Sequence, residues 1–304
     1  MRNLRKIVIG LLIALLAIPI IGFGALYFKL NSIYDREEAK QIEKIDKSEK
    51  VDGITNILLV GVDGENIDKG NRSDAMIILT IDSNNKDIRL TSLARDTYVD
   101  IPGHSKEKLT HAYAYEGPSL LLKTIKENFG ISIDKYAAVN FNSFVKVIDG
   151  IGGVEIDVTE SEVSQIPGVT QAGSQVLTGE QALSYSRIRY IDSAYARDSR
   201  QRTVLQAAYG KLLSIPKSDL LDIANTLFRY TKTNITPMEI IDIATQAIKI
   251  NDRQFDEMEF PLEGHRNGYL MNDEKGWVIE WEKDYNKDVL HKFIFDYPTY
   301  VKER

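Results

Sequence analysis

The sequence predicts an α/β sandwich built around one mixed β-sheet. Two observations predict it. Short apolar runs alternate with segments of helical periodicity along most of the chain. In addition, charged residues follow several of the apolar runs, and α/β folds place their ligand sites at strand ends. A third observation, an uncharged N-terminal run, predicts that one transmembrane helix precedes this domain.

The predicted transmembrane anchor covers residues 7–28, which carry no charge and are long enough to cross a bilayer. Arg2, Arg5 and Lys6 precede it, so residues 1–6 are expected in the cytoplasm and the rest of the chain outside. A cleaved secretory signal is the alternative, but the run ends in GFGALYF, which lacks an A-x-A-like site. Residues 29–52 are rich in Lys, Glu, Asp and Gln and are interpreted as an extracytoplasmic stalk, with the folded domain at 53–304.

Strands are expected at short apolar runs bounded by glycine or polar turns: 56–61, 76–81, 88–93, 136–141, 154–158, 255–260 and 277–281. Helices are expected where apolar residues recur at helical spacing or a cap is visible: 121–129, 142–149, 182–186, 199–215, 236–250 and 287–295. Two starts carry capping-box patterns, Thr178 with Gln181 and Thr236 with Glu239. Gly130 is placed to end the first of these helices.

Composition excludes several kinds of chemistry. The 304 residues include no cysteine, so disulfides, zinc–thiolate sites and thiol catalysis are absent. The four histidines show no HExxH spacing. The net charge of −6 and the expected extracytoplasmic location also argue against nucleic-acid binding.

Two acids follow or precede apolar strand runs. Asp63 ends ILLVGVD, and Asp74 lies just before the strand expected at 76–81. If these strands are neighbours, both carboxylates lie at one sheet edge, as in sites that hold Mg²⁺ with water and substrate phosphate oxygens. The alternative is that both acids only form turns.

Arginines are concentrated in SRIRYIDSAYARDSRQR, at positions 187, 189, 197, 200 and 202. Guanidinium groups bind phosphate oxygens in pairs, so this run suggests a site for a multiply charged phosphate group. Arg95 ends another strand run, and Lys108 is a further candidate cation. The alternative is that these side chains pair with acids on neighbouring elements or face water. With no nucleophile motif in the chain, the site is expected to act by positioning and charge stabilisation.

Seven segments occur in an order that resembles the LytR–CpsA–Psr family of Gram-positive cell-wall enzymes: ILLVGVD, NRSDAMIILTI, LTSLARDTYVDIPG, EKLTHAYAYEGP, FVKVIDGIGGVEIDV, LTGEQALSYSRIR and ARDSRQR. The resemblance covers roughly residues 53–215 and the anchor. It departs from the family pattern at Ala94, at Gly64-Glu65 and at Ala196. None of these departures removes a charged residue that the mechanism requires.

The resemblance implies an α/β/α fold with an apolar pocket for a polyprenyl tail. It also implies a single-pass protein of the cell membrane that transfers an anionic glycopolymer, such as wall teichoic acid or capsule, from a polyprenyl-pyrophosphate carrier to peptidoglycan. Asp63 and Asp74 match the magnesium-associated acids, and Arg95 is a third residue expected to act in catalysis. The residues expected to bind pyrophosphate are Arg95, Lys108, Arg187, Arg189, Arg197, Arg200 and Gln201.

Three other functions stay open at this point. A lipid-pyrophosphate phosphatase would use the same residues with water as acceptor. A non-enzymatic module would only bind anionic wall polymer. Transcription regulation, suggested by the names of some family members, disagrees with an acidic chain whose folded domain is expected outside the cell.

Overall fold

The computed structural model describes residues 30–45, 51–64, 67, 70–188, 191, 200, 203–204, 207–208, 211, 231–250, 256–271 and 275–303. The expected anchor at 7–28 and most of the helix expected at 199–215 lie outside this set. Among the described residues, no helix combines the length and the apolar character needed to cross a membrane.

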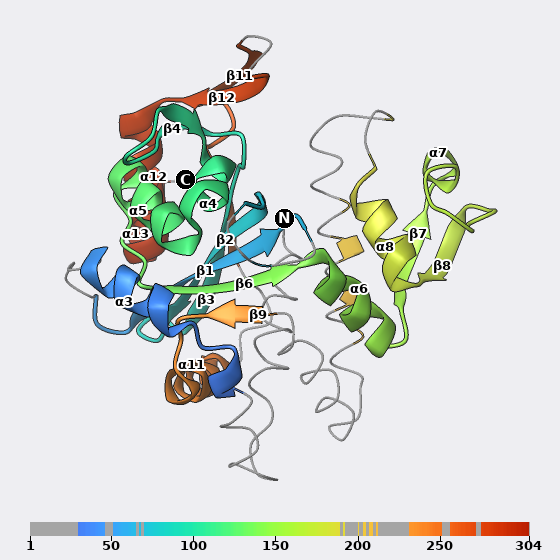
Figure 1. Ribbon diagram of the computed structural model, residues 1–304, viewed down its shortest axis with the longest axis horizontal. Helices are drawn as coiled ribbons and strands as arrows, with labels where there is room; N and C mark the ends of the chain where they lie inside the picture. Colours follow the sequence, from blue (N-terminus) through green and yellow to red (C-terminus); the bar gives the residue numbers. More distant parts are fainter. Residues whose placement is uncertain are drawn as a thin grey trace.

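A six-stranded mixed sheet forms the centre of the molecule (Figure 1), which confirms the expected α/β fold. Its spatial order is β10 (Asp256–Phe260), β3 (Asp87–Leu93), β2 (Ser73–Asp82), β1 (Ile54–Val62), β6 (Lys135–Asn140) and β9 (Thr231–Thr233). The β1–β2, β2–β3 and β6–β9 pairs are antiparallel, whereas β1–β6 and β10–β3 are parallel. β1, β3 and β6 therefore run in the same direction and end at the same edge of the sheet.

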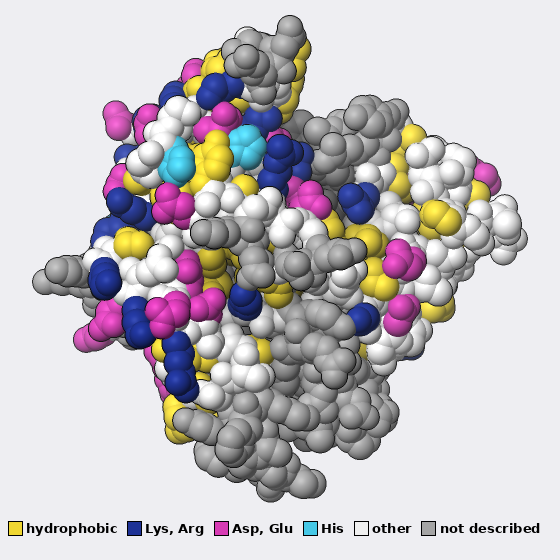
Figure 2. Space-filling model, viewed as in Figure 1, with side chains coloured by type: hydrophobic (Ala, Val, Ile, Leu, Met, Phe, Trp, Pro, Cys, Tyr) yellow, Lys and Arg dark blue, Asp and Glu magenta, His cyan; other side chains and the backbone are white. Residues whose placement is uncertain are grey.

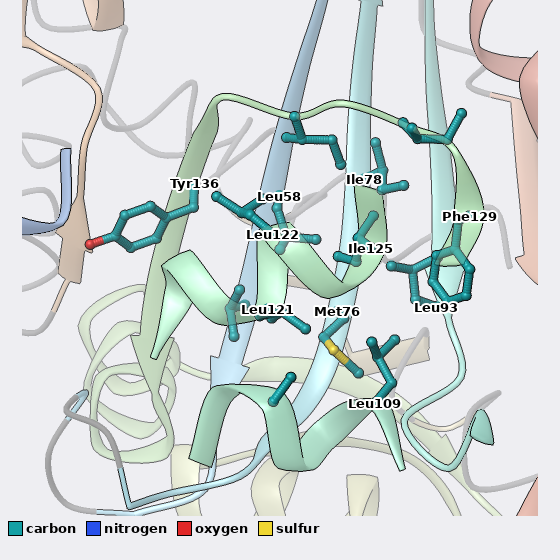
Figure 3. Close-up of a cluster of buried hydrophobic side chains, with 14 of the residues drawn as sticks. Leu58, Met76, Ile78, Leu93, Leu109, Leu121, Leu122, Ile125, Phe129 and Tyr136 are labelled. Atoms are coloured by element: carbon teal, nitrogen blue, oxygen red, sulfur yellow. The ribbon is translucent and has the colours of Figure 1, made fainter. Parts of the chain in front are cut away.

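Both faces of this sheet are covered, because its strands are apolar at successive positions rather than at alternate ones. On one face, α4 (Leu109–Glu116), α5 (Pro118–Phe129) and α12 (Lys283–Phe295) contribute to a core with Leu58 and Ile78. Figure 3 shows Leu121, Leu122 and Ile125 of α5 in this cluster. On the other face, α11 (Pro237–Ile250) packs Ile240 and Ile243 near Ile57 and Leu79.

Residues 30–45 contribute to both cores, which differs from the polar stalk expected there. Leu30 and Ile33 are buried in the cluster that includes α11. The helix α3 (Arg36–Ile45) buries Ile42 in the opposite cluster, and the Glu38 carboxylate accepts a 2.6 Å hydrogen bond from the backbone N–H of Ser119 in the first turn of α5. The packed region therefore begins before Gly53. Only three large apolar residues carry this packing, so the polar composition of the segment concealed it.

A smaller unit with its own core stands beside the sheet (Figure 1). It contains α6 (Phe141–Gly150), β7 (Val154–Val158), α7 (Glu160–Val163), β8 (Gly173–Leu177) and α8 (Gly179–Ser186). β7 pairs only with β8, so the strand expected at 154–158 belongs to a separate hairpin. The capping box expected at Thr178 is confirmed, since Thr178 Oγ1 accepts from the Gln181 N–H and the Gln181 side chain accepts from the Thr178 N–H.

The other expected caps are also confirmed. Gly130 ends α5 with φ 75°, a left-handed conformation that favours glycine. Thr236 and Glu239 exchange capping hydrogen bonds at the start of α11. The elements that were not expected are mostly short: α4, α7, β8, β9, β4 (Tyr98–Asp100), β5 (Lys106–Lys108), β11 (Arg266–Leu270) and α13 (Tyr297–Glu303). β11 pairs with the expected strand β12 (Trp277–Trp281).

Candidate active site

Two acids lie at the shared edge where β1 and β3 end. Asp63 directly follows β1, and its N–H donates to the Arg72 carbonyl at 2.8 Å, which extends the β1–β2 pairing. Gly61 pairs with Ala75 and Val62 with Ser73, so Asp74 is the extra residue of a β-bulge. A bulge bends the strand and redirects a side chain. The sequence expectation that both acids lie at one sheet edge is therefore met.

Arg95, two residues past the end of β3, joins this edge. Its guanidinium forms a short ion pair with Asp74 and lies 3.6 Å from the Asp96 carboxylate. Lys108 Nζ lies 3.7 Å from the other oxygen of Asp96. We call Asp74, Arg95, Asp96 and Lys108 the charge cluster. All four side chains are half-buried, so they remain accessible to a ligand.

The electrostatic balance of the cluster keeps Arg95 charged. Burial lowers the pKa of Arg95, but the charges and hydrogen bonds of Asp74 and Asp96 outweigh it and raise that pKa above its usual value. Arg95 Nε is buried and faces the Asp96 carboxylate at 3.6 Å. The guanidinium as a whole is half-buried, and a phosphate oxygen is the type of acceptor that it binds well.

Helix α4 fixes the backbone of the cluster. The Thr110 N–H donates to the Arg95 carbonyl at 3.1 Å, and Thr110 Oγ1 donates to the Ser73 carbonyl at 2.9 Å. The Leu109 N–H donates to the Thr97 carbonyl at 2.9 Å. The first turn of α4 therefore connects the segment that carries Asp74 to the segment that carries Arg95.

Three further residues were not chosen from the sequence, although their motif segments were. Asp96 bridges Arg95 and Lys108. Glu107 pairs with Lys275 at 3.0 Å and lies 3.5 Å from His111 Nδ1.

Burial lowers the pKa of His111, as do Arg72 and Lys108, against the opposing effect of Glu107 and Asp96. Figure 2 shows basic, acidic and histidine side chains close together on this face. Spacing alone gave no signal for Lys275, because it comes from the far end of the chain.

Arg187 lies beside the same edge, at the end of β6. It follows α8, is exposed, and its guanidinium lies 5.3 Å from the ring centroid of Phe141. Phe141 follows Asn140, which pairs with Val62 of β1. Arg187, the first arginine of the run, and Asp63 thus lie at neighbouring strand ends. Arg189, Arg197 and Gln201, three other residues expected to bind pyrophosphate, lie outside the described residues.

Arg200 has a different environment from the one expected for a phosphate ligand. Its Nε lies 2.5 Å from Glu162 Oε1, and both side chains are buried in the smaller unit. Glu162 Oε2 also accepts from the Thr159 N–H at the start of α7. This pairing corresponds to the alternative considered from the sequence, an arginine that neutralises an acid on a neighbouring element.

The carboxylate oxygens at this edge fit a magnesium ion whose other ligands are water and substrate oxygens. Within the described part of the chain, no three His, Asp or Glu side chains converge as a ready-made metal site. Asp63 and Asp74 supply two carboxylates from neighbouring strands, which matches how Mg²⁺ is held beside phosphates. Asp74 also holds Arg95, so its two oxygens are able to serve different partners.

Comparison with known proteins identifies the family of this chain. The LytR_cpsA_psr family model matches residues 24–283. Among curated relatives, the chain is 35% identical over 249 residues to the polyisoprenyl-teichoic acid–peptidoglycan teichoic acid transferase TagU of Enterococcus faecalis, covering 77% of this chain and 80% of that protein. It is also 35% identical over 260 residues to the corresponding transferase TagT of Bacillus subtilis, covering 78% and 80%.

Solved structures show the same fold. A structure titled TagT bound to LI-WTA matches with a TM-score of 0.65 at 26% identity, covering 83% of this chain and 94% of that one. The family protein YwtF (TagT) with bound octaprenyl pyrophosphate lipid matches with a TM-score of 0.60 at 26% identity, covering 82% and 95%. Because the family model spans most of the sequence, the chain belongs to the LytR_cpsA_psr family.

Proposed function

We propose that this protein transfers an anionic glycopolymer of the teichoic acid class from a polyprenyl-pyrophosphate carrier to peptidoglycan. The observation that carries the proposal is the convergence of Arg95, Lys108 and Arg187 with Asp63 and Asp74 at one edge of the sheet. Cations placed around a transferred phosphorus stabilise its charge and need no covalent intermediate. The transferase names of the relatives support this choice of reaction.

In the proposed reaction, a sugar hydroxyl of peptidoglycan attacks the glycan-side phosphorus of the carrier. The bond from this phosphorus to the bridging oxygen breaks, and polyprenyl phosphate leaves with that oxygen. Arg95 binds the pyrophosphate with its planar fork, oriented by Asp74 and Asp96, and Lys108 and Arg187 add positive charge. In this proposal Asp63 or Asp74 accepts the hydroxyl proton, and a loose transition state requires little base assistance.

Asp63 and Asp74 would also hold a magnesium ion. Bound there, Mg²⁺ would offset the negative charge of the pyrophosphate. Arg189, Arg197 and Gln201 belong to the proposal as pyrophosphate ligands through the family motif alone. Arg200 is left out of this set, because its buried ion pair with Glu162 supports the smaller unit instead.

The membrane is the proposed location of the protein. Residues 7–28 would cross it once, with residues 1–6 in the cytoplasm and the catalytic domain outside. The donor lipid lies in the same membrane, so the anchor keeps enzyme and donor together. The proposal also includes an α/β/α sandwich with an apolar pocket for the polyprenyl tail, as the family resemblance implies.

The test combines the purified full-length protein with a polyprenyl-pyrophosphate glycan donor and peptidoglycan fragments. Glycan attached to peptidoglycan and free polyprenyl phosphate are measured separately. Transfer that stops in EDTA, resumes with Mg²⁺ and falls roughly a hundredfold in Asp63→Asn supports the proposal. Asp63 is exposed, so this variant is expected to fold normally.

Three results would contradict it. Release of polyprenyl phosphate without glycan transfer identifies a phosphatase. Full transfer in EDTA rejects the metal. Polymer binding with no bond broken, unchanged in Asp63→Asn, identifies a binding module.

A further inference from the structure

An exposed tryptophan lies on the hairpin formed by β11 and β12, which projects beside β4 (Figure 1). Trp277 is 51% exposed, and its cross-strand partner Leu270 is 69% exposed. Figure 2 shows hydrophobic side chains at this end of the molecule. Exposing an indole to water is costly, so the position suggests a ligand for its face.

The indole ring lies across the backbone of the facing strand. A Cβ atom added to Gly268 would be 2.5 Å from Trp277 Cζ2, so the six-membered ring occupies the space above this glycine. The strand therefore supports one face of the ring, while the residue as a whole remains 51% exposed. A side chain at position 268 would push the ring away from this orientation.

Three contacts hold the hairpin against the charge cluster. The Ile279 N–H donates to the Asp96 carbonyl at 2.9 Å. Lys275 Nζ donates to the Lys106 carbonyl at 2.8 Å and pairs with Glu107 at 3.0 Å. Gly276, next to Trp277, is so close to Lys108 that an added Cβ would lie 3.7 Å from Lys108 Nζ. The platform made by Trp277, Leu270 and Gly268 is thus adjacent to the proposed phosphate site.

The chemistry of this platform selects a sugar ring as its ligand. Two exposed apolar side chains are far fewer than the roughly 20–30 residues that each partner contributes to a stable protein interface. A polyprenyl tail requires an enclosed apolar pocket rather than a projecting hairpin. A pyranose ring presents C–H groups on one face and hydroxyls around its rim, which suits a single indole surrounded by polar residues.

We propose that this platform binds a pyranose ring of the peptidoglycan acceptor and places its neighbouring hydroxyl beside the charge cluster. The inference rests on the proposed transfer reaction and names its acceptor subsite. Trp277 and Leu270 carry no charge, so the platform does not serve the donor phosphates, which require cations. The donor glycan also contains sugar rings, and the separate KM values of acceptor and donor distinguish the two substrates.

Fluorescence tests this proposal without any transfer activity. The chain contains two tryptophans, and Trp281 packs among Phe129 and Phe260. Trp281→Phe in the full-length protein leaves Trp277 as the only reporter. Titration with peptide-free peptidoglycan oligosaccharides is expected to shift or quench its emission in a saturable manner. In the reciprocal variant, Trp277→Phe, the emission of Trp281 should not respond.

Steady-state transfer supplies the second measurement. Trp277→Ala is expected to raise the KM for the acceptor about tenfold with little change in the KM for the donor, on the scale of one aromatic stacking contact. Trp277→Phe should retain most of the affinity. Met238→Ala is the matched control, since Met238 is 57% exposed on α11, on the other face of the sheet.

Two outcomes overturn the acceptor subsite, and a third overturns only the proposed reaction. No change in Trp277 emission with oligosaccharide rejects it, even if transfer proceeds. A rise in the KM for the donor alone would show that the platform binds the donor rather than the acceptor. If emission responds but no variant transfers glycan, the platform stands as a sugar site and the proposed reaction fails.

Discussion

Arg95 is the residue that connects most of the candidate site, because it contacts Asp74 and Asp96 and is tied through its carbonyl to α4. Arg95→Lys keeps the charge but removes the planar fork. Affinity for a polyprenyl-pyrophosphate analogue is expected to fall at least about tenfold, roughly 1.4 kcal/mol, by isothermal titration calorimetry.

The matched control for this change is Arg36→Lys, since Arg36 is exposed on α3 and donates a hydrogen bond to the Asn31 side chain. It should bind the analogue normally. If Arg95→Lys instead binds normally but unfolds at a lower temperature, Arg95 is a structural ion-pair partner.

The buried pair of Arg200 and Glu162 has a consequence for stability at different pH values. Burial raises the pKa of Glu162, but hydrogen bonds from Thr159 and Arg200 outweigh this effect and lower it below the usual value. A carboxylate with a lowered pKa stabilises the fold above its unfolded pKa of about 4.3, and this contribution disappears as the pH falls through the folded pKa.

Glu162→Gln removes the carboxylate that neutralises the buried Arg200 charge. At pH 7 the loss is expected to be about 3–5 kcal/mol in the free energy of unfolding, measured by urea denaturation. The difference from the unchanged protein should shrink as the pH falls below about 4. Glu160→Gln, at an exposed position of α7, should change little at any pH. A difference that persists undiminished at low pH would rule out the ion pair as its cause.

At the scale of elements, the first turn of α4 forms a brace: its hydrogen bonds connect the start of β2 to the segment that follows β3. Thr110→Val removes the hydroxyl that donates to the Ser73 carbonyl while preserving the shape of a buried side chain. We expect a loss of about 1–3 kcal/mol in the free energy of unfolding and weaker binding of the pyrophosphate analogue, because Asp74 follows Ser73.

Thr245→Val provides the control for Thr110→Val. Thr245 also donates its hydroxyl to a carbonyl, that of Ile241, but lies exposed on α11. Urea denaturation and calorimetry on both variants separate a local stability effect from an effect on the site. Unchanged analogue affinity in Thr110→Val would show that the brace does not position Asp74.

The helices and strands differ in how well the sequence predicted them. Long apolar runs and side-chain caps predicted β1, β2, β3, α5, α8 and α11 because their signals are local. β4, β5 and β9 have three residues each, too few for a periodic pattern. The acids of the site were found because each adjoins a strong strand. Lys275 and the partner of Arg200 were missed because contacts between distant segments leave no pattern in either one.

At the scale of the whole molecule, the last two helices complete a core that the family match does not reach. The matched region ends at residue 283, yet Leu290, Phe293 and Ile294 of α12 are at most 1% exposed. Burying a large apolar side chain contributes about 1.5–3 kcal/mol, so losing three removes a large part of a typical stability of about 5–15 kcal/mol.

A chain that ends at residue 283 is therefore expected to be insoluble or to unfold without cooperativity, as followed by circular dichroism during heating. A chain that ends at residue 296 is the control, since it loses only α13, in which no residue is buried. It should fold with a modest loss of stability. Cooperative unfolding of the shorter chain near the original midpoint would show that α12 is dispensable.

The pairing of β10 with β3 has a further consequence for how the protein is made. Asp256 lies opposite Arg89, 167 positions earlier in a chain of 304 residues. During synthesis, the outer edge of β3 stays bare until the ribosome has added residue 260. Bare strand edges recruit other chains, and slowly completed sheets are prone to aggregate. A chaperone that shields residues 87–93 of the nascent chain would therefore raise the yield of folded protein.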